Sequence, residues 1–187
     1  MPAFLHGRVQ RLEALLTTSS AALGTYNRFD LDLPDVVVSF LDSAIESHRA
    51  LGLPDVENEM LALKSQYVSA QRGVQPFTLE QVTTRRREMA RSIALRVLLD
   101  SAARLRDELA ADHQSLDDGR TQLRPIVLSA IHKGFTSADH QPTITQAELD
   151  ALWAAITIDA DLQLAARQLT MQLSQPDIQL LLAELLA

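Results

Sequence analysis

Side chains that could carry out acid–base or metal chemistry are sparse in this 187-residue chain. It contains no cysteine, which excludes disulfides, thiolate catalysis and cysteine-ligated zinc or iron–sulfur sites. His113 and Asp117 are four residues apart and would share a helix face, but two ligands at this spacing arise readily by chance. No HExxH motif and no pair of ExxH helices accompanies them. We therefore predict an acidic surface there and no metal site.

His48 is the next candidate, and it lies within SAIESHRALG, four residues before Gly52. This spacing resembles histidine phosphotransfer domains, in which the phosphorylated histidine is followed by lysine and then glycine on a bundle helix. The resemblance implies phosphoryl transfer at His48. However, Leu51 stands before Gly52, where the family has a lysine that assists phosphate binding. His48 also continues an apolar helical stripe, so we interpret it as a histidine at the edge of the core.

The stretch SADHQPTITQAE resembles the exit of an EF-hand calcium loop, with Ile144 at the central position and Glu148 as the last ligand. Its beginning departs from that pattern. Ser137 replaces the first aspartate, and Pro142 replaces the glycine that permits the sharp turn. We therefore predict no calcium site and interpret Thr145 with Glu148 as a capping box that begins a helix.

Motifs for nucleotide binding and for hydrolysis are also missing from the sequence. The chain has only six glycines and contains no Walker loop, GxGxxG or GxSxG motif. We therefore expect a protein that is not an enzyme, with no catalytic residues, no cofactor and no metal. An enzyme or small-ligand binder with a pocket between two packing groups remains an alternative.

Seven arginines between Arg85 and Arg106 form the main charge feature of a chain with a formal net charge of −7. At about 100° per residue these arginines scatter around a helix instead of forming one stripe. A helix that tracks phosphates would gather its cations on one face.

Acidic residues also lie at pairing distance along the same helix: Glu88 precedes Arg91 by three residues, and Asp100 precedes Arg104 by four. The pattern thus favours a solvated, partly paired helix surface over a nucleic-acid contact. A regulator that binds nucleic acid through the Arg85–Arg91 cluster is the alternative.

Apolar residues recur at three- and four-residue spacings along almost the whole chain, which is typical of amphipathic helices. Prolines and capping residues mark expected helix starts, and glycines mark expected ends. The starts include Pro34, Pro54, Thr145, Asp159 or Asp161, and Ser174, and the ends include Gly24, Gly52, Gly73 and Gly134.

A long helix over about residues 79–113 is the predicted centre of the fold. Thr78 with Gln81 reads as its capping box, and no helix breaker occurs before Gly119. A separate short helix is expected over 125–133.

The apolar face of this long helix changes sides partway along, which indicates two sets of packing neighbours. We expect one helical domain spanning 1–187. Within it, residues 1–98 and 99–187 would form two packing groups.

The C-terminal stretch SQPDIQLLLAELLA carries apolar residues on both sides of a helix. Such a helix either inserts into its own domain or covers a groove on a partner. The predicted partner-binding residues are Ile178, Leu181, Leu182, Leu185 and Leu186.

These patterns predict an all-α protein, a mainly antiparallel bundle of seven or eight helices around one long central helix. No window is apolar enough to span a membrane, the N-terminus lacks the apolar core of a signal peptide, and the absence of cysteine favours the cytoplasm. The functional hypothesis is a non-catalytic, self-associating module for protein–protein interaction, such as an adaptor, a chaperone-like protein or a secretion-linked accessory protein.

Overall fold

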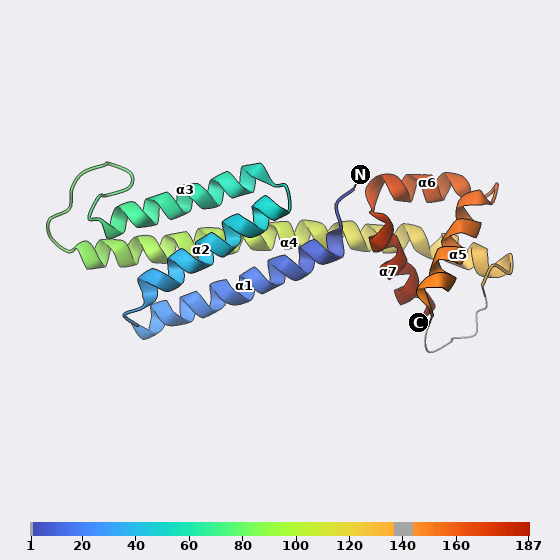
Figure 1. The fold of residues 1–187 in the computed structure, drawn as a ribbon, viewed down its shortest axis with the longest axis horizontal. Helices are drawn as coiled ribbons and strands as arrows, with labels where there is room; N and C mark the ends of the chain where they lie inside the picture. Colours follow the sequence, from blue (N-terminus) through green and yellow to red (C-terminus); the bar gives the residue numbers. More distant parts are fainter. Residues whose placement is uncertain (1, 137–143) are drawn as a thin grey trace. The chain divides into compact units, whose positions relative to one another are not determined.

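The computed structural model describes residues 2–136 and 144–187, and these residues form seven helices and no β-strand (Figure 1). The prediction of an all-α bundle around one long helix is confirmed. None of the described helices is long and apolar enough to cross a membrane. The helices are α1 (Leu5–Arg28), α2 (Leu33–Ala50), α3 (Pro54–Gln71), α4 (Arg86–His132), α5 (Gln146–Ile158), α6 (Gln163–Gln172) and α7 (Gln175–Leu186).

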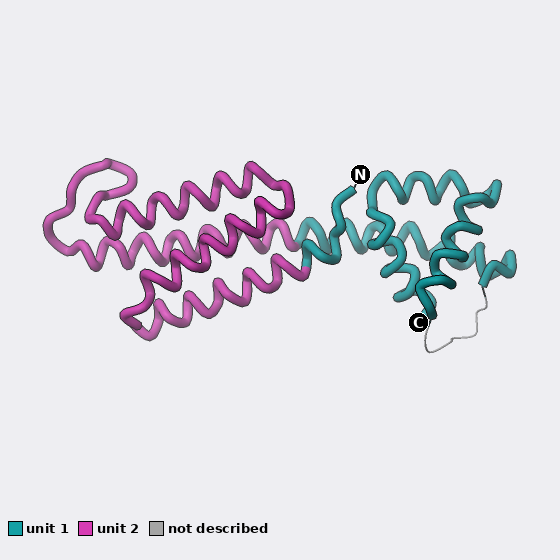
Figure 2. Tube along the Cα trace, in the orientation of Figure 1, with its two compact units in different colours: residues 1–9, 110–187 teal, residues 10–109 magenta. Residues whose placement is uncertain are grey.

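The chain divides into two compact units, which are coloured separately in Figure 2. Unit 1 contains residues 1–9 and 110–187, and unit 2 contains residues 10–109. Both α1 and α4 therefore contribute residues to both units. The expected division between residues 98 and 99 falls within unit 2.

Unit 2 is built on the hairpin of α2 and α3, together with most of α1 and the first part of α4. Pro34 and Pro54 lie in the first turns of α2 and α3, where a missing backbone N–H costs nothing. Gly52 joins the two helices with a φ of +67°, which glycine adopts without strain. The largest fully buried side chains of this unit are Leu12, Phe40, Leu41, Met60, Tyr67, Leu98 and Leu105.

Unit 1 packs α5, α6 and α7 with the second part of α4. Its fully buried side chains include Leu123, Ile156, Leu169 and Ile178. Thr145 and Glu148 form the predicted capping box of α5, with both reciprocal hydrogen bonds present. Ser174 likewise caps α7 by accepting a hydrogen bond from the Asp177 backbone N–H.

The bounds predicted for the long helix were wrong at both ends. α4 begins at Arg86, because Thr78 and Gln81 belong to a loop in which Gln81 pairs with Val74 through an antiparallel bridge. The helix then continues through Gly119 to His132, so the separate short helix over 125–133 does not form.

Two features explain why α4 continues past its expected end. Gly119 is buried and faces Leu173, so it serves close helix packing and does not end a helix. Pro125 lies inside the helix beside Leu123, Ile126 and Val127, whose burial offsets the lost backbone hydrogen bond. Similarly, α1 runs past Gly24 to Arg28, and the chain reverses at Phe29.

Candidate protein-interaction face

Two loops of unit 2 carry large apolar side chains into solvent. One is the turn between α1 and α2 (residues 29–32), and the other connects α3 to α4 (residues 72–85) (Figure 1). The exposed fractions are 73% for Phe29, 96% for Leu31, 49% for Phe77 and 77% for Leu79. Single exposed apolar residues are ordinary on protein surfaces, so their grouping and their backbone conformation decide whether they matter.

The loop over 72–85 is an ordered, hairpin-like structure. Gln75 N–H donates to the Glu80 carbonyl at 2.9 Å, and Val82 N–H donates to the Gly73 carbonyl at 2.8 Å. The Gln75 side chain accepts hydrogen bonds from the backbone N–H groups of Phe77 and Thr78 at the tip. Phe77 and Leu79 are therefore held outward by defined hydrogen bonds, which lowers the entropy that a binding partner must remove.

The backbone of both loops is strained where the apolar side chains are displayed. Among the described residues, three other than glycine have a positive φ: Phe29 at 60°, Leu79 at 61° and Arg85 at 56°. This left-handed region costs an L-residue roughly 1–2 kcal/mol. At Phe29 this conformation also closes α1, because the Asp30 backbone N–H donates to the Thr25 carbonyl as at many helix ends. Leu79 lies in the second loop, away from any helix end, and strain of this kind is retained mainly at binding and switching segments, which supports a functional role for that loop.

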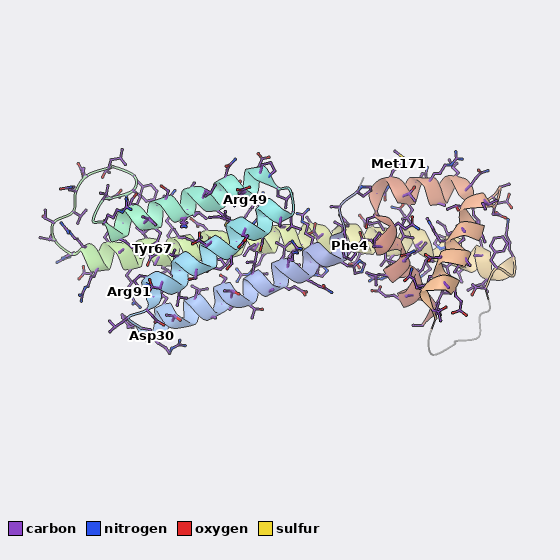
Figure 3. All side chains as sticks on the ribbon, in the orientation of Figure 1. Phe4, Asp30, Arg49, Tyr67, Arg91 and Met171 are labelled. Carbon is purple, nitrogen blue, oxygen red and sulfur yellow. The ribbon has the colours of Figure 1, made fainter. Side chains whose placement is uncertain are left out.

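The first turns of α4 connect the two loops through arginine–aromatic contacts. The Arg91 guanidinium lies 3.7 Å from the ring centroid of Phe29 and 4.2 Å from that of Tyr26, and it donates to the Tyr26 carbonyl. The label of Arg91 stands close to that of Asp30 in Figure 3, where α1 turns into α2. Five residues later, the Arg96 guanidinium lies 4.6 Å from the ring centroid of Phe77.

The exposed arc of α4 between these two arginines carries further apolar side chains. At about 100° per residue, Arg91 and Arg96 border an arc that contains Leu95 and Leu99. Leu95 is half-buried, and Leu99 is 49% exposed. We call this set the arginine–aromatic face, and it consists of Phe29, Leu31, Phe77, Leu79, Arg91, Leu95, Arg96 and Leu99.

The arginines of the predicted cluster make separate local contacts. Arg85 lies 3.8 Å from Glu88, and Arg86 donates to the Val82 carbonyl at 2.8 Å. The expected pairing of Glu88 with Arg91 is thus replaced by pairing with Arg85, because Arg91 turns toward Tyr26 and Phe29.

The second expected pair is also replaced. Asp100 lies 3.5 Å from Arg96, while Arg104 reaches Glu59 at 3.2 Å and Glu108 at 3.3 Å.

The residues predicted to bind a partner through α7 divide into two groups. Ile178, Leu181 and Leu182 are fully buried in unit 1, whereas Leu185 and Leu186 are half-buried. Contact between this helix and a partner stays a prediction, and only its last two leucines and the exposed Leu180 are accessible for it.

His48 is fully buried in unit 2, so no phosphate donor can reach it there. Its Nδ1–H donates to the Ala44 carbonyl at 2.7 Å, and its Nε2 lies 3.4 Å from a carboxylate oxygen of Glu108. Glu108 was missed as a buried charge, although it follows the buried Leu105 by three residues on α4. This pair is internal to unit 2 and offers no site for a substrate.

Asp177 forms a second buried polar cluster, in unit 1. It accepts hydrogen bonds at 2.9 Å from the backbone N–H groups of Leu5 and His6, one at 2.7 Å from His6 Nδ1, and one from the Ser174 hydroxyl. Serine, histidine and aspartate resemble a hydrolytic triad in type only, because both partners bind the carboxylate and no serine–histidine contact activates a nucleophile. The cluster therefore links helix ends.

Of the remaining candidates, Glu148 and Asp117 have structural partners. Ser137 and Pro142 lie outside the described residues. Glu148 accepts hydrogen bonds from the Thr145 backbone N–H and hydroxyl, and these lower the pKa of its carboxyl. Asp117 pairs with Arg120. Within residues 2–136 and 144–187, no group of three or more histidine, aspartate or glutamate side chains could hold a metal ion.

Comparison with known proteins adds no assignment, since no protein-family model, curated protein or solved structure matches the chain.

Proposed function

We propose that this protein is a non-catalytic helical module for protein–protein interaction and that it binds its partner through the arginine–aromatic face. The observation that carries the proposal is the display of Phe29 and Leu79 at positive φ, with exposed fractions of 73% and 77%. Exposing a large apolar side chain on strained backbone is doubly unfavourable in the free chain. A bound partner would bury these side chains and so recover part of that cost.

The composition of the face supports a protein partner. Protein interfaces are enriched in aromatic residues and arginine, and the residues that dominate binding energy are drawn largely from the same types. The Arg91 and Arg96 guanidiniums already rest on aromatic rings, so little side-chain entropy remains to be lost when they bind. An adaptor, chaperone-like or secretion-linked role, with the partner either another protein or a second copy, would use such a face.

The proposal is tested with a Phe29→Asn, Leu79→Asn double variant. Asparagine tolerates the left-handed backbone region, so the double variant should keep the fold while losing the apolar contacts. The full chain is used to purify binding proteins from its native host, and its self-association is followed by sedimentation. We expect the dissociation constant for the resulting partner to rise at least about tenfold in the double variant.

The matched control is a Leu164→Asn, Met171→Gln double variant. These two side chains on α6 in unit 1 are 67% and 81% exposed, so the control removes similar apolar area at another place. It should bind the partner as the natural chain does. Equal binding by the Phe29/Leu79 variant would contradict the proposal, as would a strictly monomeric chain that binds no protein.

A further inference from the structure

We infer that the partner presents an acidic polypeptide segment that also carries apolar side chains, and this inference rests on the proposed function. The contacting carboxylates would lie against residues 72–96, and the uncharged apolar side chains would lie against the α1–α2 turn. Both parts follow from how charge is distributed over the two loops.

Residues 72–96 form a strongly basic segment of an acidic protein. They contain six arginines and only two acidic residues, both glutamates, for a net charge of +4 in a chain whose net charge is −7. Glu88 neutralises little of this charge, because its contact with Arg85 joins two side chains that are 74% and 81% exposed. Carboxylates of a partner would therefore meet an attractive potential here, and lysines or arginines would be repelled.

The arginines are also suited to carboxylates in geometry. A guanidinium that rests on an aromatic ring keeps its N–H edge free for hydrogen bonds in the plane of the group. Arg96 rests on Phe77 in this way and is 57% exposed. Its contact with Asp100 is long, at 3.5 Å, and is readily exchanged for a shorter contact with a partner.

The α1–α2 turn selects the opposite kind of residue. Phe29 and Leu31 alternate there with Asp30 and Asp32, and Asp35 follows in the first turn of α2. Arg28 pairs with Asp30 at 3.0 Å, which leaves the turn with a net negative charge. A partner segment that crosses both loops must therefore place its acids on the α4 side and apolar, uncharged residues at the turn.

This division favours a polypeptide over a nucleic acid. A nucleic acid carries a charge at every phosphate, so a strand that crosses the face would bring phosphates against Asp30 and Asp32. One face of the Phe29 ring and one face of the Phe77 ring are covered by a guanidinium, and Leu31 and Leu79 offer no surface for base stacking.

Selection of random peptides displayed on phage against the immobilised full chain tests the inference. We expect the enriched peptides to be acidic and to contain apolar residues outside the acidic part. A labelled synthetic copy of an enriched peptide should bind an Arg85→Glu, Arg96→Glu variant at least about tenfold more weakly, and its binding should weaken as salt is raised. The control is an Arg124→Glu, Arg167→Glu variant with the same net charge, and it should bind as the natural chain does.

Several results would overturn the inference. Enriched peptides that are neutral or basic, no enrichment at all, or equal binding to the Arg85/Arg96 variant would each do so. If the enriched peptides are neutral or basic but bind the Phe29/Leu79 variant more weakly than the natural chain, the proposed function stands and only the partner chemistry is wrong. If the enriched peptides bind the Phe29/Leu79 variant as tightly as the natural chain, the inference and the proposed function both fail. Binding of a short single-stranded RNA, or of a short DNA duplex, that is lost when Arg85 and Arg96 are replaced would identify nucleic acid as the ligand instead.

Discussion

At the scale of single residues, Asp177 shows how a buried carboxylate can join two chain ends without any catalytic role. It follows Ser174 in the first turn of α7 and accepts the backbone N–H groups of Leu5 and His6, which begin α1. Burial raises the pKa of Asp177, but the hydrogen bonds from Ser174, His6 and Leu5 outweigh this effect and hold the pKa below its usual value.

This lowered pKa predicts a defined dependence of stability on pH. The folded chain binds the Asp177 proton less tightly than the unfolded chain, so the carboxylate contributes its full stability above the unfolded pKa, near 4. The contribution is lost as the pH falls through the lower, folded pKa. We expect an Asp177→Asn variant to be about 2 kcal/mol less stable at neutral pH, with a difference that narrows as the pH falls below about 4.

Denaturant unfolding followed by the fluorescence of Trp153, the only tryptophan and a buried residue of unit 1, provides the measurement. Asp118→Asn, at an exposed residue of the same unit, is the control and should change the unfolding free energy by less than about 0.5 kcal/mol. A pH-independent difference for Asp177→Asn would show that the charge is not the stabilising feature.

Residue-level features could be predicted where their signal is local. Ser174 was expected to start a helix because a cap and its target are three residues apart. By contrast, Asp177 meets Leu5 and His6 across nearly the whole chain, and no local pattern reveals such a contact. The contact of Arg91 with Phe29 was not expected for the same reason, because the two residues lie far apart along the chain.

At the scale of elements, glycine has two different roles inside the helices. A Cβ atom added at Gly119 in α4 would lie 2.3 Å from Leu173 Cδ1 and 3.5 Å from Leu181 Cδ1. A Cβ atom at Gly24 in α1 would meet only the flexible end of Arg28, at 3.3 Å.

Alanine at these two positions should therefore change stability in opposite directions. Gly24→Ala should stabilise unit 2 by about 0.5–1 kcal/mol, because alanine is the better helix former. Gly119→Ala gains the same propensity but overpacks Leu173, so we expect a net loss of about 1 kcal/mol from unit 1. Circular dichroism and Trp153 fluorescence during denaturation measure the two changes. A stabilised Gly119→Ala variant would mean that α4, α6 and α7 do not approach so closely.

The elements were predictable to the extent that helical periodicity and capping specify them. The capping box at Thr145 was recognised because both partners of the motif are present and an apolar helical pattern follows. Thr78 with Gln81 has the same spacing, yet Gln81 is drawn into a bridge with Val74. The extension of α4 through Gly119 was not predictable, because only the packing of Leu173 against that glycine explains it.

At the scale of the whole molecule, the two units use their polar and apolar residues differently. Unit 2 exposes Phe29, Leu31, Phe77 and Leu79 in two loops beside a basic helix start, whereas unit 1 exposes Leu164 and Met171 on α6 and Ile158 at the end of α5. Outside residues 72–96 the chain has a net charge of −11, which follows from −7 for the whole and +4 for that segment.

The fold class could be read from the sequence because apolar spacing persists along the whole chain. The candidate face could be predicted only in part. The arginines were apparent from composition, but their aromatic neighbours are distant along the chain: Phe77 is about 20 residues from Arg96, and Phe29 is about 60 residues from Arg91. The positive φ of Phe29 and Leu79 has no signature in residue type, since glycine or asparagine would be the expected residue there.

The most direct test of the proposed interaction face is photo-crosslinking in the native host, with a photoreactive phenylalanine at Leu79 or Leu99. We expect a discrete crosslinked protein adduct from these two positions and none from the exposed control positions Leu164 and Met171. Adducts of equal strength from all four positions, or none from Leu79 and Leu99, would contradict it.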